Sequence, residues 1–160
     1  MKEKWIAALL LLLVLAIAVG IFLFSSQTGE ESGGISRGLT ERIFAFLGAD
    51  EATAQKLHHF VRKAAHMAEF AVLGASVSMF LFYISDKGYF HAGSRRFQAL
   101  WAFALAFLYA VTDEVHQYFV PGRGPSAKDV LIDSIGVMIG IALLWAADRR
   151  IHGKKKDSER

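Results

Sequence analysis

The chain opens with an apolar pattern that has no polar helical face. Residues 5–24 read WIAALLLLLVLAIAVGIFLF, a run of 20 residues without an ionisable or amide side chain. About 20 such residues in a helix cross a hydrocarbon core roughly 30 Å thick, so we predict a membrane span here. The alternative is a cleaved signal peptide, whose apolar core usually has about 7–15 residues before a small-residue cleavage site. We favour the span because this run ends in bulky side chains, Ile21 to Phe24.

Three shorter apolar segments follow the first one, at residues 70–84, 97–112 and 134–147. Each is too short to cross a bilayer unaided, so each must take in polar residues at one end. We therefore predict further spans at about 66–84, 97–119 and 130–147. If the spans alternate in direction, their polar ends meet the C-terminal end of the first span on one side of the membrane.

The loop between the first two predicted spans, residues 25–65, has an amphipathic stretch of its own. Apolar side chains share one helical face there and charged side chains occupy the other, which predicts a short interfacial helix. The apolar residues are Ile35, Leu39, Ile43, Phe46 and Leu47. Asp50 suits the N-cap of a helix that runs from Glu51 directly into the second span. The fold class we expect is all-α: a single domain over residues 1–160, forming an integral membrane four-helix bundle with this interfacial helix in the first outer loop.

Charge decides the expected orientation. The 160 residues are 54% hydrophobic and 21% charged, an ordinary charged fraction that argues against a disordered tail or a nucleic-acid-binding arm. The predicted side that holds both termini carries 11 Lys and Arg in 29 residues, against 7 in 50 on the other side. Short cytoplasmic loops are enriched in Lys and Arg, so we place both termini in the cytoplasm and the polar ends outside. The basic tail 148–160 then anchors against anionic lipid.

Several carboxylates lie in or beside the predicted spans, where each costs a few kcal/mol near the bilayer centre. Helical spacing puts Lys63, His66 and Glu69 on one stripe, and Asp113 with Gln117, like Asp129 with Asp133, at i and i+4. One interpretation is an ion-pair latch that pins the helix ends together. We favour a site at the outer leaflet, because two or three ion pairs would hold four helices and apolar packing would avoid the desolvation cost.

The residue types suggest what such a site does. His66, one turn before Glu69, suits a base or ligand oriented by a carboxylate, and Arg123, in a Pro-Gly turn, suits bidentate capture of a phosphate or carboxylate. Ligand types permit a divalent metal at His66 with neighbouring acids, but no metal-site spacing supports one and we predict none. No pattern identifies a cofactor, and the chain has no cysteine. A proton or ion pathway is disfavoured because the charges occupy one half of the membrane.

Residues 109–123, YAVTDEVHQYFVPGR, followed by Ser126, Asp129 and the run VLIDSIG, resemble the VanZ-like family of small bacterial membrane proteins. The resemblance extends to Phe24-Ser25-Ser26-Gln27 and to Lys63-x-x-His66-x-x-Glu69-Phe70, while the family commonly has Asn in place of Asp133. It implies a four-span membrane protein related to one linked to low-level teicoplanin resistance. Some relatives carry a phosphotransbutyrylase label, which we discount because acyl-CoA chemistry needs a cytoplasmic site.

We therefore predict an outer-leaflet pocket that recognises or modifies a lipid-linked envelope component or an amphiphilic glycopeptide, with membrane lipid as partner and no nucleic acid. The alternative is a non-catalytic structural or binding protein with an ion-pair latch. The candidate catalytic residues are His66, Glu69, Asp113 and Glu114. The candidate ligand-binding residues are Ser25, Gln27, Lys63, Gln117, Arg123, Ser126, Asp129 and Asp133.

Overall fold

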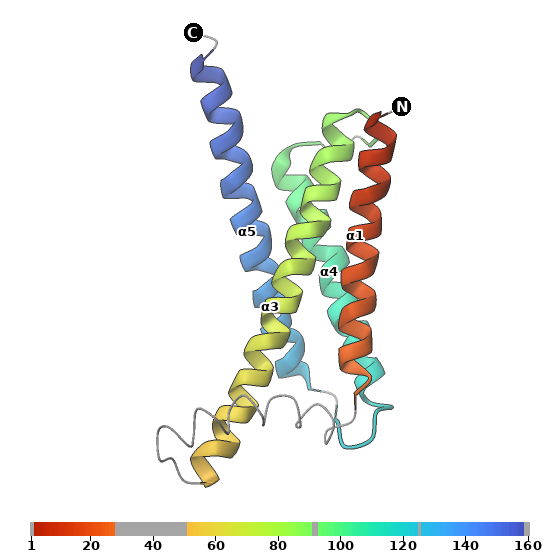
Figure 1. Ribbon diagram of the computed structural model, residues 1–160, viewed down its shortest axis with the longest axis vertical. Helices are drawn as coiled ribbons and strands as arrows, with labels where there is room; N and C mark the ends of the chain where they lie inside the picture. Colours follow the sequence, from red (N-terminus) through yellow and green to blue (C-terminus); the bar gives the residue numbers. More distant parts are fainter. Residues whose placement is uncertain (1, 28–50, 91–92, 125, 159–160) are drawn as a thin grey trace.

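The described part of the chain is entirely helical apart from connecting turns, as the sequence predicts. The computed structural model describes residues 2–27, 51–90, 93–124 and 126–158, and no strand occurs in these ranges. The helices are α1 (Lys2–Ser25), α3 (Glu51–Asp86), α4 (Arg95–Gln117) and α5 (Ala127–Ser158). Successive helices alternate in direction, so that the start of α1 and the end of α5 lie at the same end of the molecule (Figure 1).

The helix boundaries extend the predicted spans into polar sequence. Helix α3 begins at Glu51, which confirms the prediction of one helix running from the first loop into the second span. Helix α5 continues through the predicted basic tail to Ser158, whereas α4 ends at Gln117 rather than at residue 119. The predicted interfacial helix and the Asp50 cap lie outside the described residues.

Three of the helices contain segments long and apolar enough to cross a membrane, within the part of the chain that the structure describes. These segments are Lys2–Ser25, Phe60–Asp86 and Ala127–Arg150. Helix α4 does not meet the same criterion, because Gln98 near its start and Asp113 and Glu114 near its end leave a short apolar middle. The predicted span at about 97–119 is therefore still a prediction.

The packing of α4 places small side chains inside and large ones outside. Its buried face is built from alanines, namely Ala99, Ala102, Ala106 and Ala110. Its exposed face carries large apolar residues, namely Phe97, Leu100, Trp101, Leu105 and Leu108. Small residues at helix contacts are characteristic of membrane proteins, since lipid solvates large apolar side chains as well as a protein core does.

Helix α3 is the centre of the structure and contacts α1, α4 and α5. Its Phe70 is fully buried, with its ring 6.2 Å from that of Tyr109 on α4. Where α3 crosses α5, Gly136 and Gly140 leave no space for a Cβ atom, because the Met67 and Ala71 carbonyl oxygens already occupy it. These two glycines therefore let the backbones of α3 and α5 pack closely.

Ion pairs close the end of the molecule where α1 begins. Lys87 contacts Glu3 at 2.6 Å, and Arg95 contacts Asp86 at 2.7 Å and Asp148 at 3.3 Å. The hydrogen bond from Lys87 to Glu3 raises the pKa of this lysine. These contacts join residues of all four helices at this end.

Candidate functional site

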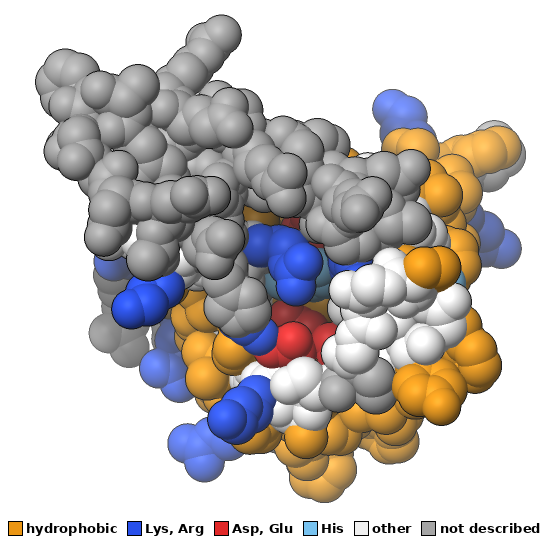
Figure 2. Space-filling model, turned by 90° about the horizontal axis from the view of Figure 1, so that it is seen from below, with side chains coloured by type: hydrophobic (Ala, Val, Ile, Leu, Met, Phe, Trp, Pro, Cys, Tyr) orange, Lys and Arg blue, Asp and Glu red, His pale blue; other side chains and the backbone are white. Residues whose placement is uncertain are grey.

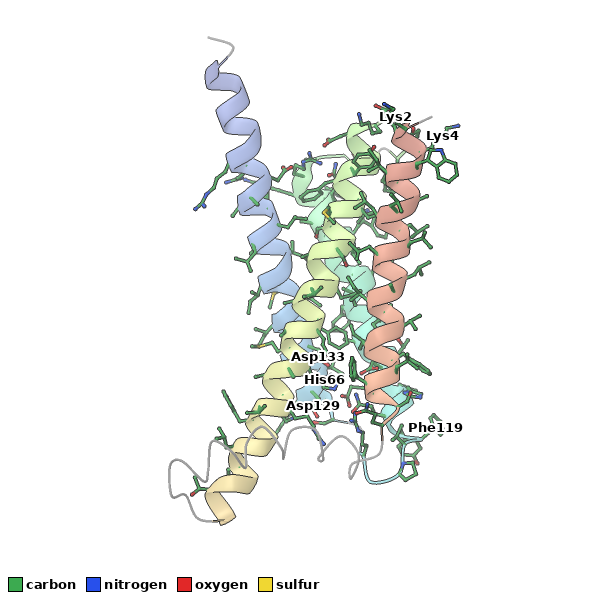
Figure 3. The ribbon with its side chains drawn as sticks, in the orientation of Figure 1. Lys2, Lys4, His66, Phe119, Asp129 and Asp133 are labelled. Carbon is green, nitrogen blue, oxygen red and sulfur yellow. The ribbon has the colours of Figure 1, made fainter. Side chains whose placement is uncertain are left out.

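A polar pocket lies at the opposite end of the molecule, between α3, α4, α5 and the loop that joins α4 to α5. It is open to one side and encloses about 320 Å³, including its mouth. Its lining residues are Arg62, Lys63, His66, Glu114, Gln117, Arg123, Asp129, Ile132 and Asp133. Figure 2 views this end and shows acidic side chains at the centre with Lys and Arg beside them. Figure 3 shows His66, Asp129 and Asp133 close together near this end.

Helical periodicity brings the lining residues of α3 and α5 to the pocket. Arg62 and His66 are four residues apart on α3, and Asp129 and Asp133 are four residues apart on α5, so each pair shares a face. His66 is half-buried, with its ring 6.5 Å from that of Phe70. Each helix therefore presents one polar face to the same space.

A tight turn carries Arg123 into the pocket. The Arg123 N–H donates to the Val120 carbonyl at 3.1 Å, and Gly122 between them has a φ of 76°. Proline before a glycine with positive φ is the signature of a type II turn. The Arg123 side chain is half-buried, and its buried Nε has no hydrogen-bond partner within the described protein.

Glu114 joins the end of α4 to the beginning of α5. Its Oε2 accepts a hydrogen bond from the Ser126 N–H at 2.9 Å, and the Ser126 carbonyl accepts one from the Asp129 N–H at 2.8 Å. The first N–H groups of a helix have no partner within that helix, so a carboxylate here stabilises its start. Ser126 thus acts through its backbone and does not line the pocket.

A buried hydrogen-bond network, which we call the Asp113 network, lies beside the pocket. Asp113 Oδ2 accepts from Ser25 Oγ and from Gln117 Nε2, both at 2.8 Å. Ser25 is completely buried and Asp113 is 3% exposed. The network fixes the end of α1 against α4, and of its three members only Gln117 lines the pocket.

The charged groups of the pocket are unevenly paired. Lys63 and Asp129 form an ion pair and are partly exposed. Asp133 lines the pocket and is 2% exposed. The pKa of Arg123 lies below its ordinary value because its guanidinium group is buried and because the Arg62 cation is near. Two guanidinium groups that repel each other in one partly buried space favour an anion between them.

The structure brings seven of the candidate residues together around the pocket: Lys63, His66, Glu114, Gln117, Arg123, Asp129 and Asp133. The others lie elsewhere. Glu69 and Asp113 are absent from the lining, and each has a buried carboxylate oxygen without a partner in the described protein. Ser25 belongs to the Asp113 network, and Gln27 lies in the bend after α1, where its N–H donates to the Phe24 carbonyl.

Two lining residues, Arg62 and Ile132, were not predicted from the sequence. Arg62 is four residues before His66, so it shares a helical face with His66 and could have been grouped with Lys63, His66 and Glu69. Ile132 has no comparable signal, because an isoleucine in an apolar helix looks like any other packing residue. Among the described residues, no group of three His, Asp or Glu side chains could hold a metal ion.

Most of the chain, including this pocket, lies within the match to one known family. A family model described as VanZ/LLP1 matches residues 9–148, a range that includes every pocket residue. The chain belongs to the VanZ/LLP1 family. No curated protein and no solved structure matches it. Membership links this VanZ-like protein to glycopeptide resistance at the level of the family, and its long apolar helices agree with a membrane protein.

Proposed function

We propose that this VanZ-like protein crosses the bacterial cytoplasmic membrane with four helices and binds an anionic, lipid-linked component of the cell envelope in its polar pocket. Binding lowers the susceptibility of the cell to glycopeptide antibiotics. The observation that carries the proposal is the pair of arginines, Arg62 and Arg123, at one open pocket. The link of the family to glycopeptide resistance supports an envelope ligand.

The arginine pair supports a phosphate or carboxylate ligand. A guanidinium group presents its donors in a planar fork that matches two oxygens of either anion. The buried Nε of Arg123 has no acceptor among the described residues, and an unpartnered buried donor costs about 1–3 kcal/mol. An anionic oxygen placed at this nitrogen removes that cost.

The size of the pocket favours a lipid headgroup over a whole glycopeptide. The space of about 320 Å³ includes open solvent at the mouth, so the enclosed part of the pocket is small. We expect it to receive a charged headgroup, with the rest of the lipid outside. A glycopeptide is much larger and could only place one substituent there.

The position of the basic residues supports an outward-facing pocket. The opposite end of the molecule holds Lys2, Lys4, Lys87, Arg95 and Arg96, and the positive-inside tendency assigns that end to the cytoplasm. The pocket then lies at the outer leaflet, where lipid-linked envelope components are accessible to extracellular antibiotics.

The test is teicoplanin susceptibility of a susceptible host that expresses the protein, with folded protein measured in parallel. We expect Arg123→Gln and Arg62→Gln each to return the host to the susceptibility of cells without the protein. The matched control is Arg96→Gln, an exposed arginine at the opposite end, which should keep the resistance. If both pocket variants retain resistance at normal protein levels, the proposal is wrong.

The second candidate function is structural, with the polar residues acting as a latch between helix ends. The contacts of Glu114 with Ser126 and of Asp113 with Ser25 favour it, because both join separate helices. Glu114→Gln distinguishes the two. It removes the charge but keeps an oxygen that can accept from Ser126. A latch therefore predicts normal folded protein and unchanged resistance, whereas a pocket in which this carboxylate faces the ligand predicts changed resistance at a normal amount of folded protein.

A further inference from the structure

Two buried groups at the pocket have opposite charge and opposite hydrogen-bonding character. Arg123 Nε is a buried donor without an acceptor among the described residues, and Asp133, which is 2% exposed, brings a carboxyl group to the same pocket. An anionic group can accept from the guanidinium group but does not complement a carboxylate, and a cationic group has the reverse preference. A ligand that complements both charges therefore needs two different groups.

The exposed fractions of the side chains show how deeply each charged group is buried in the pocket. Lys63 and Asp129 have side-chain exposures of 25% and 27% and neutralise each other. Asp133 is 2% exposed and lines the same pocket, so its side chain is more deeply buried than this ion pair. A ligand group that reaches Asp133 must therefore enter the buried part of the pocket.

Charge excludes the simplest ligands. An isolated phosphate suits Arg62 and Arg123 but is repelled by Glu114 and Asp133, which border the same space. An isolated cation suits Glu114 and Asp133 but is repelled by Arg62 and Arg123. A ligand with both charges satisfies the donors and the acceptors together, and leaves no charge buried without a partner.

We propose that the ligand of the pocket is a zwitterionic phosphate ester with a primary amine, its phosphate bound by Arg62 and Arg123 and its ammonium group bound by Asp133. This rests on the proposed function and names its ligand class. The chemistry is that of an aminoethyl phosphate group, either in the headgroup of phosphatidylethanolamine or as a free phosphoethanolamine.

The test is binding by the purified full-length protein in a non-ionic detergent, measured by native mass spectrometry with short-chain lipids. Phosphatidylcholine keeps both charges but has no ammonium N–H donors, and phosphatidylglycerol keeps the phosphate but has no cation. We expect phosphatidylethanolamine to bind at least about tenfold more tightly than either, which corresponds to about 1.4 kcal/mol. Free phosphoethanolamine should compete with it if the headgroup alone is recognised, and should fail to compete if the lipid chains are needed.

Variants assign the two charges. Asp133→Asn keeps the shape of the side chain and removes its charge, so it should abolish the preference for phosphatidylethanolamine without weakening phosphatidylglycerol binding. Arg123→Gln should weaken all three lipids. Glu114→Gln changes the second acidic residue of the pocket and should also reduce the preference for phosphatidylethanolamine. It therefore tests the inference even if Asp133→Asn does not fold. Asp86→Asn and Arg96→Gln, at the other end of the molecule, are the matched controls and should change nothing.

The outcomes separate this inference from the proposed function. Equal binding of the three lipids, with Asp133→Asn and Glu114→Gln weakening them equally or not at all, overturns the zwitterion and leaves an anion site. Loss of all binding, or binding that Arg123→Gln does not change, overturns the proposed function as well.

Discussion

Ser25 and Ser26 are adjacent in the sequence and lie in different surroundings. Ser25 is fully buried and donates to the Asp113 carboxylate at 2.8 Å, whereas Ser26 is exposed and donates to the Phe22 carbonyl, one turn back in α1, at 2.7 Å. We expect Ser25→Ala to lower the free energy of unfolding by about 1–2 kcal/mol, because it leaves a buried carboxylate with one donor fewer.

Ser26→Ala is the matched control and should change the free energy of unfolding by less than about 0.5 kcal/mol, since water replaces the lost bond. The measurement is unfolding of the two purified variants in detergent, side by side with the wild type. Equal effects of the two substitutions would show that the Asp113 network does not hold α1 against α4.

At the scale of elements, the contact between α3 and α5 depends on glycine. A Cβ at Gly140 would overlap the backbone carbonyl of Ala71, which can move only if the two helices separate. We expect Gly140→Ala to destabilise the protein by about 1–3 kcal/mol, the usual cost of overpacking. Gly20 on α1 has nothing within 4 Å of its Cβ position, so Gly20→Ala should be neutral or stabilising by up to about 1 kcal/mol. Thermal unfolding of both variants tests this contrast, and a Gly140→Ala protein as stable as Gly20→Ala contradicts it.

The turn before α5 also depends on glycine at one position. Gly122 has a φ of 76°, where a side chain is strained, whereas Gly124 is not in that region and has free space around it. We expect Gly122→Ala to cost about 1–2 kcal/mol and to reduce resistance by moving Arg123. Gly124→Ala should affect neither stability nor resistance. Susceptibility assays and unfolding of both variants check this, and a fully resistant Gly122→Ala strain would mean that the turn does not position Arg123.

The sequence predicts the helices wherever an apolar run requires burial or lipid, as in α1 and the middle of α3. The sequence predicts less well where the helices end. Helix α5 continues to Ser158 through basic residues, whose backbone hydrogen bonds form in water without any apolar pattern to mark them. The apolar middle of α4 is short, so its composition alone does not define a membrane span.

At the scale of the whole molecule, the account requires the pocket and the chain ends to lie on opposite sides of the membrane. The native chain lacks cysteine, so single cysteines report topology directly. We expect Gly124→Cys, in the loop beside the pocket, to react with an impermeant thiol reagent in intact cells. Tyr89→Cys, which is exposed at the opposite end, should react only after the membrane is opened. The reverse pattern would place the pocket in the cytoplasm.

The convergence of polar residues at one end could also be predicted, because alternating helices bring the ends carrying His66, Gln117 and Asp129 together. The division of these residues into roles could not. Helical spacing does not distinguish Asp113, fixed in a buried network, from Asp133, which lines the pocket. That difference depends on neighbours distant in the sequence, such as Ser25.

The most direct test of the central claim, that two arginines hold an anionic lipid group, is the phospholipid that remains with the purified protein. Wild type and the Arg62→Gln/Arg123→Gln double variant would be purified from the same host membranes, and lipid phosphorus measured per mole of protein. The account predicts that the wild type retains about one phospholipid that the double variant loses, as expected for one specific pocket. Equal amounts in the two proteins, both folded, would contradict it.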